Sequence, residues 1–226
     1  MTAVADTHTL ALPVVCPITE DHRPRVQRGR HDRSARVLTR DELRALTAAC
    51  HEPRDALVVA LLLTDGLRVS ELCAASEDDI VAERGRTWLR ITRKGGTTTR
   101  VPLDPAVVAL LDTYRTARPD SSDDTAPLIR DEHGRRIDRH DITRMLRRLA
   151  RAAGLDRPAT VTPHALRASA ITALIDGGRP VVDVQRWAGH ASITTTMTYY
   201  DAADRDARHA AMTADLASLL ACPQQP

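Results

Sequence analysis

The chain has 226 residues, a formal net charge of +2, 42% hydrophobic residues and no Phe. This length suits one large core or two small ones, and the scarcity of aromatic residues means that the core must be aliphatic. The longest apolar run, Ala56 to Leu63, is far shorter than the roughly 20 residues that a membrane-spanning helix needs. The four cysteines lack metal-ligand spacing, which argues against a metal site and indicates a reduced, cytoplasmic protein.

The basic residues are unevenly distributed. Residues 22–36 contain six arginines against one acid, and a second cluster runs from Arg135 to Arg151. Basic clusters on a near-neutral chain indicate a polyanionic partner, although arginines on solvated faces explain either cluster equally well. Because residues 1–36 show no sustained hydrophobic period, we expect a disordered basic N-terminal arm there and a folded domain at 37–220.

The folded part is predicted to begin with a helix capped at Thr39, which starts a capping box. Residues 54–65 are apolar nearly all round, so they predict a central, buried helix that ends at Gly66. The chain then turns directly out of this helix. We expect Arg68 to be held at the edge of the core, beside the carboxylate of Glu71.

Two strands are predicted at 87–92 and 97–103, joined in a hairpin by a turn that contains Lys94 and two glycines. Lys94 is the only lysine in the chain, against 31 arginines. Arginine cannot release a proton at an accessible pH, whereas lysine can when its pKa is tuned. Lys94 is therefore a candidate proton donor, and a solvated cation in a turn is the alternative.

Further helices are predicted from Asp104, at 139–153, at 163–176, from Pro180 at position N1 to about Ala188, and at 203–220. The helix at 139–153 has an apolar stripe and, on a different face, a row of guanidinium groups suited to a DNA backbone: Arg144, Arg147, Arg148 and Arg151. An ordinary amphipathic surface helix explains the same pattern. The predicted fold is mainly α with a small antiparallel β-sheet, an α+β arrangement.

Polar residues from separate segments suit one type of chemistry, the cleavage of a phosphodiester without a metal or cofactor. They are Arg68, Lys94, His164, Arg167, His190 and Tyr199. Arginine forks bind phosphoryl oxygens in a bidentate manner, a tyrosine oxygen can attack phosphorus, and a lysine can protonate the leaving 5′-oxygen. His164 and Arg167 lie three apart, so they share one face of a helix.

Five of these residues occur in the motifs GLRVSEL at 66–72, HALR at 164–167, WAGH at 187–190 and TTTMTYY at 194–200, and the sixth, Lys94, lies in the predicted β-hairpin. In order and spacing, the chain resembles the catalytic domain of the tyrosine recombinase (phage integrase) family over about residues 37–215. The resemblance implies the integrase catalytic-domain fold. It also implies DNA strand cleavage and rejoining without metal or ATP.

The resemblance further implies individual roles. Arg68 and Arg167 would clamp the scissile phosphate, and His190 would donate a hydrogen bond to it. Lys94 would be the general acid for the 5′-oxygen. Tyr199 would attack phosphorus and form a 3′-phosphotyrosyl link.

Two assignments are less direct. His164 would assist proton movement at the tyrosine or hold the phosphate. Tyr200 competes with Tyr199 as the nucleophile, and the nine-residue step from His190 favours Tyr199.

The resemblance implies double-stranded DNA as the partner, a homo-tetramer on DNA, and a cytoplasmic, nucleoid-associated location. Family members usually carry a separate helical domain before the catalytic one. We expect no such domain here, so the basic arm or an accessory protein would have to replace it. Two alternatives stay open: a relaxing enzyme similar to type IB topoisomerases, and a DNA-binding remnant of a recombinase without autonomous activity.

Overall fold

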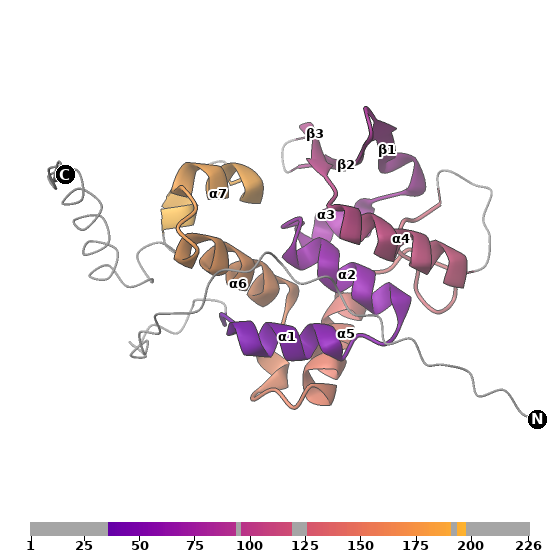
Figure 1. Cartoon of the computed structure of the whole chain (residues 1–226). Helices are drawn as coiled ribbons and strands as arrows, with labels where there is room; N and C mark the ends of the chain where they lie inside the picture. Colours follow the sequence, from indigo (N-terminus) through magenta and orange to yellow (C-terminus); the bar gives the residue numbers. More distant parts are fainter. Residues whose placement is uncertain (1–35, 94–95, 119–125, 191–193, 198–226) are drawn as a thin grey trace, which may run out of the picture.

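The computed structural model describes residues 36–93, 96–118, 126–190 and 194–197. The fold is mainly helical, with a small antiparallel sheet at one edge of the helical body (Figure 1), and the sequence predicts this combination of helices and a small sheet. In chain order the elements are α1 (Arg40–Ala48), α2 (Pro53–Leu63), α3 (Val69–Ala74), η1 (Glu77–Asp79), β1 (Ile80–Glu83), β2 (Arg86–Thr92), β3 (Thr98–Pro102), α4 (Pro105–Ala117), α5 (Arg139–Ala152), η2 (Pro158–Thr160), α6 (Pro163–Asp176) and α7 (Val181–Ala188).

Most predicted elements occur within one or two residues of their expected bounds, including the capping box at Thr39. The sequence analysis did not predict α3 and β1, which have only six and four residues and are too short to show a period. Pro180 is the N-cap of α7 rather than its first helical residue. The predicted helix at 203–220 lies outside the described residues. In the described part of the chain, no helix is long and apolar enough to cross a membrane.

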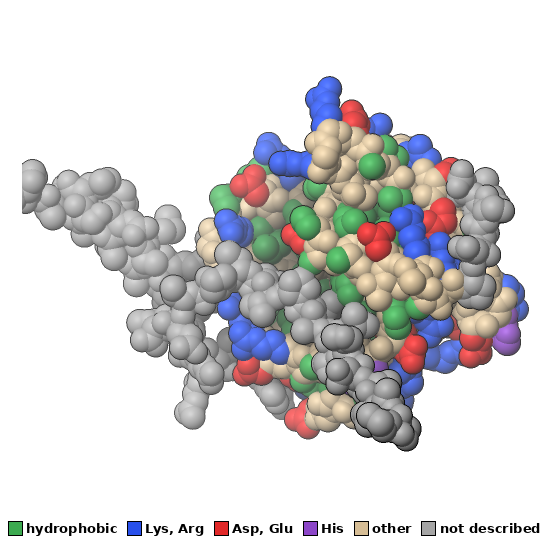
Figure 2. Space-filling model, turned by 45° about the vertical axis from the view of Figure 1, so that its right-hand side comes forward, with side chains coloured by type: hydrophobic (Ala, Val, Ile, Leu, Met, Phe, Trp, Pro, Cys, Tyr) green, Lys and Arg blue, Asp and Glu red, His purple; other side chains and the backbone are tan. Residues whose placement is uncertain are grey.

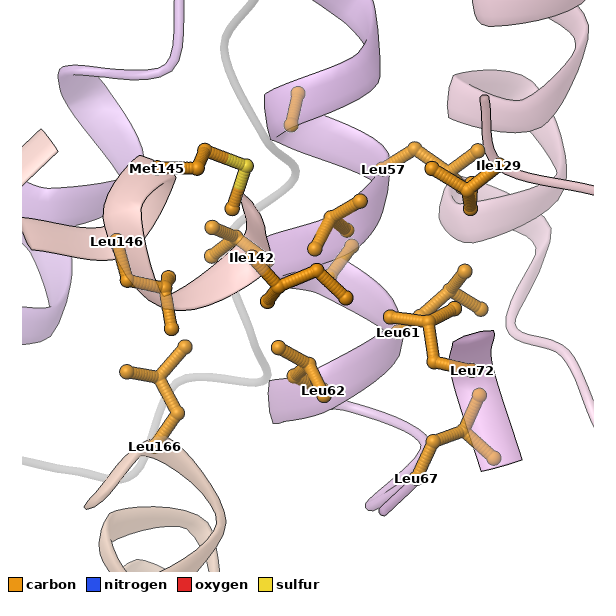
Figure 3. Packing of buried hydrophobic residues seen from close by; sticks show 14 of the residues in the cluster. Leu57, Leu61, Leu62, Leu67, Leu72, Ile129, Ile142, Met145, Leu146 and Leu166 are labelled. Atoms are coloured by element: carbon orange, nitrogen blue, oxygen red, sulfur yellow. The ribbon is translucent and has the colours of Figure 1, made fainter. Parts of the chain in front are cut away.

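Helix α2 forms the centre of the main core, as its apolar sequence predicts. Its residues from Asp55 to Leu62 are all buried. Figure 3 shows its leucines meeting Ile142 and Leu146 of α5 and Leu166 of α6. Each such side chain contributes about 1.5–3 kcal/mol when it is fully buried. The core therefore fixes the end of α2, from which Arg68 emerges.

Helices α6 and α7 share a second, smaller cluster. Its buried members are Ile171 and Ile175 of α6 with Val184 and Ala188 of α7. Trp187 packs against this cluster from the side. Part of the attachment of α7 to the domain therefore comes from a few apolar contacts with α6.

The sheet has the order β1-β2-β3, with antiparallel pairing throughout. In β2, Leu89 and Ile91 are buried against the helices, while Arg90 lies on the opposite face and pairs in register with Arg100 of β3. The burial of one face fixes the register of the hairpin. The turn between β2 and β3 is consequently held at a defined edge of the helical body.

The arginine row on α5 is partly used for internal ion pairs. Arg148 binds the carboxylate of Asp55 on α2, whose side chain is only 1% exposed. Arg54 is the other cation near Asp55, at 3.4 Å. Arg144 binds Asp141 on its own helix, and both residues belong to the solvent-facing side of α5. Arg148 therefore has a structural role that the sequence pattern did not indicate.

Residue Arg36, the last residue of the expected arm, is also bound to the folded domain. Its guanidinium donates to the backbone oxygens of Asp156 and Arg157 and to the hydroxyl of Thr160, and it pairs with Glu42. These contacts join the start of α1 to the η2 turn. The ordered structure thus includes Arg36.

We predict that Arg148→Ala lowers the free energy of unfolding by about 1–3 kcal/mol, because Asp55 would stay buried with only Arg54 nearby. The matched control is Arg144→Ala, which removes the same charge from an exposed pair and should cost less than about 0.5 kcal/mol. Urea unfolding of both variants measures the difference. Equal effects would contradict a structural role for Arg148.

A second buried carboxyl group, that of Asp65, follows α2. The side chain is 5% exposed and accepts a hydrogen bond of 3.2 Å from the hydroxyl of Thr64. Burial raises the pKa of Asp65 to about 7; the hydrogen bond from Thr64 opposes this rise and the carboxylate of Asp104 adds to it. The folded protein therefore holds this proton at a pH where the unfolded chain has lost it.

Because the pKa of Asp65 is higher in the folded state, its contribution to stability is lost as the pH rises from about 4 to about 7. We predict that Asp65→Asn has little effect near pH 4 and stabilises the protein by on the order of 4 kcal/mol above pH 7. Chemical unfolding of both proteins across this range measures the difference. A stability difference that does not change with pH would contradict the buried, protonated carboxyl group.

Candidate functional site

The loop between α2 and α3 places Arg68 at the edge of the core. Gly66 adopts a positive φ of 59°, which turns the chain so that Leu67 is buried and Arg68 becomes the N-cap of α3. The carboxylate of Glu71 accepts hydrogen bonds of 2.8 Å from both the backbone N–H and the guanidinium of Arg68. The expected position of Arg68 beside Glu71 is confirmed.

The second arginine, Arg167 on α6, lies within hydrogen-bonding distance of the same loop. Its guanidinium donates to the backbone oxygens of Gly66 and Ala188. Arg68 donates to the backbone oxygen of Gly189 at 2.8 Å. Arg167 is only 6% exposed, so it is a buried cation whose hydrogen bonds join the end of α2 to the end of α7.

Close packing at Gly66 holds α7 against α2. A Cβ atom on Gly66 would lie 2.7 Å from the indole ring of Trp187, closer than such contacts occur. The indole N–H of Trp187 donates to the backbone oxygen of Thr64 over 3.2 Å. The glycine of the GLRVSEL motif therefore permits both the left-handed turn and the approach of α7.

Gly189 ends α7 in the left-handed conformation, with φ of 58°, and presents His190. The backbone N–H of His190 donates to the oxygen of Gln185, and the Gln185 side chain donates to the oxygen of His190, both at 3.1 Å. Nδ1 of His190 lies 2.9 Å from the hydroxyl of the buried Thr196. These contacts fix the imidazole in position and orientation.

The electrostatic environment keeps His190 neutral at pH 7. Burial, followed by the charges of Arg167, Arg68 and Arg93 and by His164, lowers the pKa of His190 to about 4. An anion bound among these cations would act in the opposite direction and favour protonation. The site is therefore positively charged and suited to bind an oxyanion.

The structure brings together four of the six residues predicted for the active site, namely Arg68, His164, Arg167 and His190. His164 is exposed on the first turn of α6 and contributes to the low pKa of His190. Lys94 and Tyr199 lie outside the described residues, as does Tyr200. The sequence analysis gave no role to Arg93, the neighbour of Lys94, or to Thr196 within the TTTMTYY motif, because the contacts of both residues depend on the fold.

The four arginines of the predicted DNA-binding row on α5 differ in their exposure and in their contacts. Arg148 and Arg144 bind carboxylates, whereas Arg151 is exposed and Nε of Arg147 is buried without a hydrogen-bond acceptor. In the view of Figure 2, basic side chains are interspersed with acidic ones over the coloured surface, rather than gathered in one patch. Among the described residues, no group of three His, Cys, Asp or Glu side chains could hold a metal ion.

The sequence profile of the phage integrase family matches residues 36–206. Tyrosine recombinase XerC of Corynebacterium efficiens is 33% identical to this chain over 193 residues, which cover 84% of this chain and 58% of the relative. Tyrosine recombinase XerA of Thermococcus kodakarensis is 33% identical over 169 residues, which cover 73% of this chain and 57% of the relative.

Solved structures show the same fold. The crystal structure of XerA recombinase matches with a TM-score of 0.66 at 27% identity, over 83% of this chain and 65% of that chain. A post-cleavage complex of XerH site-specific recombinase with its palindromic difH substrate matches with a TM-score of 0.64 at 24% identity, over 78% of this chain and 52% of that chain. The chain spans less than two thirds of each of these relatives. Its fold, its motifs and the profile match nonetheless agree, and the chain belongs to the phage integrase family, with the catalytic-domain fold of the tyrosine recombinases.

Proposed function

We propose that this chain is a site-specific tyrosine recombinase, which cleaves and rejoins DNA strands through a 3′-phosphotyrosyl intermediate without metal or ATP. The convergence of Arg68, Arg167 and His190 at the end of α7 carries the proposal. Three cationic or hydrogen-bonding groups from separate segments meet at one point, where a phosphate group would complement them. The curated relatives named tyrosine recombinase support the same function.

Arg68 and Arg167 would bind the scissile phosphate. Both guanidinium groups now donate to backbone oxygens, which are neutral acceptors. The non-bridging oxygens of a phosphate are charged and make stronger hydrogen bonds with arginine. A phosphate that enters the site would therefore replace some of these carbonyl oxygens as the hydrogen-bond acceptor. The guanidinium groups would already be in position to bind it.

Neutral His190 would donate a hydrogen bond to the same phosphate. If the hydroxyl of Thr196 donates to Nδ1 of His190, the ring proton resides on Nε2 and faces the phosphate. A neutral donor adds little electrostatic repulsion to a site that already contains arginines. The hydrogen bond from His190 would strengthen as negative charge develops on the phosphoryl oxygens during attack.

The covalent chemistry would involve Tyr199 and Lys94. The phenolic oxygen of Tyr199 attacks phosphorus, the bond from phosphorus to the 5′-oxygen breaks, and Lys94 gives a proton to that oxygen. His164 takes up the phenolic proton or holds the phosphate. Distance along the chain supports these roles. Lys94 directly follows Arg93, and Tyr199 is three residues beyond Thr196, so its Cα atom lies at most about 11 Å from that of Thr196.

Rejoining would occur when the 5′-hydroxyl of another strand attacks the phosphotyrosyl bond. Because this bond conserves the energy of the phosphodiester, the reaction needs no ATP. Double-stranded DNA is the proposed substrate, in keeping with the DNA-bound state of the XerH recombinase structure. We also propose a tetramer on DNA, an accessory protein or the basic arm as an aid to binding, and a cytoplasmic location on the nucleoid.

The nucleophile is tested by trapping on nicked suicide duplexes, in which cleavage releases a short fragment and prevents rejoining. A pool with randomised sequence removes the need to know the target site. We predict a covalent adduct on a denaturing gel that Tyr199→Phe abolishes and that Tyr200→Phe, the matched control, retains.

Each other outcome has a definite meaning. An adduct that survives Tyr199→Phe refutes the assignment of the nucleophile. DNA binding without any adduct supports the binding remnant instead. Relaxation of supercoils without exchange between duplexes supports activity of the topoisomerase IB type.

The general acid is tested with Lys94→Arg, which keeps the positive charge but removes the ability to release a proton. We predict a loss of cleavage of about 100-fold or more, with DNA affinity largely kept. A 5′-phosphorothiolate substrate, whose sulfur leaves without protonation, should restore cleavage by this variant. Normal cleavage of ordinary DNA by Lys94→Arg would show that the lysine supplies only a charge.

A further inference from the structure

The end of β2 directs a further arginine toward the cationic site. Leu89 and Ile91 are buried on the inner face of the sheet, and residues two apart on a strand share a face. Arg93 continues this alternation, so its side chain leaves the hairpin on the face that meets the helices. Its backbone N–H donates to the oxygen of Thr97 at 2.8 Å, and its oxygen accepts from Gly96 at 3.0 Å.

The guanidinium of Arg93 lies directly over Gly189. A Cβ atom on Gly189 would overlap Nη1 and Cζ of Arg93. Only a glycine leaves this space open without displacing the arginine, and the positive φ of Gly189 favours glycine for a second reason. Nη1 of Arg93 donates to the backbone oxygen of Ala188 over 3.4 Å, a long and weak hydrogen bond.

Arg93 is less firmly bound than the other arginines of the site. Within the described residues, the contact with Ala188 is the only hydrogen bond that its side chain makes, and no carboxylate lies within 4.0 Å of it. Arg68, by contrast, is paired with the carboxylate of Glu71 at 2.8 Å. Arg93 therefore gives up little when it exchanges this carbonyl for a stronger acceptor.

The charges around the end of α7 do not balance. Three guanidinium groups, those of Arg68, Arg93 and Arg167, contact the backbone oxygens of Ala188 or Gly189. Among the contacts of the described residues, one carboxylate, that of Glu71, is paired with Arg68. Within this group of four side chains, positive charge exceeds negative charge by two.

We propose that Arg93 is a third phosphate-binding arginine, which leaves Ala188 and binds the scissile phosphate together with Arg68 and Arg167. This inference rests on the proposed function and extends its site. A phosphodiester carries one negative charge, and attack by a deprotonated tyrosine oxygen brings a second to the transition state. Arg68, Arg167 and Glu71 together leave one net positive charge, and Arg93 adds a second to balance the charge that develops.

The test uses Arg93→Ala in the full chain, with Arg100→Ala as the matched control. Arg100 belongs to the same hairpin, and its removal changes the net charge equally, but it pairs with Glu83 on β1 and lies outside the site. Both proteins are compared on one duplex sequence that forms an adduct in the trapping experiment with the randomised pool. The same duplex carrying a methylphosphonate at the scissile position, which is uncharged, serves as the second substrate.

We expect Arg93→Ala to lose about 100-fold in the rate of adduct formation on the phosphate substrate and much less on the methylphosphonate, relative to the unaltered chain. Arg100→Ala should be within about threefold on both. Equal losses of Arg93→Ala on the two substrates would overturn the proposal, since they would indicate a structural role. An unchanged rate on the phosphate substrate would overturn it as well.

A binding measurement separates this proposal from the proposed function. Inorganic vanadate or phosphate is titrated into each protein, and the imidazole signals of His164 and His190 are followed by NMR. We expect Arg93→Ala to weaken anion binding about tenfold or more and Arg100→Ala to leave it unchanged. If the unaltered chain forms no adduct with any DNA, the proposed function fails, and this titration alone decides the role of Arg93; equal affinities overturn it.

Discussion

The buried guanidinium of Arg167 is the interaction on which the site depends. It reaches from α6 to the backbone oxygens of Gly66 and Ala188, and so joins the end of α2 to the end of α7. A buried charge is costly unless hydrogen bonds satisfy it, and removal of its acceptors would leave that cost uncompensated. The hydrogen bonds of Arg167 therefore favour the arrangement in which both helix ends stay together, and this arrangement also positions Arg68 and His190.

The same arrangement stores electrostatic repulsion. Guanidinium groups lie close to one another at the end of α7, where the partial negative charge of the helix C-terminus and the carboxylate of Glu71 offset only part of their charge. Burial, and then these charges, lower the pKa of His190 to about 4. An anion relieves the repulsion, so the free protein is pre-organised for a phosphate and pays little to reorganise when it binds.

The sequence predicted the helices, caps and strands that depend on residues close together along the chain. The apolar run of α2, the capping box at Thr39 and the alternation in β2 all follow local rules, and they occur as expected. The motif residues Arg68 and Arg167 were found because the family pattern marks them. The contact of Arg148 with Asp55 joins residues 93 positions apart, and no local rule reports such a pair. The position of Arg93 over Gly189 was missed for the same reason.

The division of the core explains why glycines matter so much at this site. Helix α7 rests on the small cluster it shares with α6, rather than on the main core around α2. Its attachment to α2 therefore depends in part on Trp187, which needs the empty space at Gly66, and Arg93 reaches the carbonyl of Ala188 only because Gly189 has no side chain. A methyl group on Gly66 would displace Trp187 and with it α7, whereas a methyl group on Gly189 would displace the guanidinium of Arg93. The two glycines thus set the geometry of the site separately from the stability of the main core.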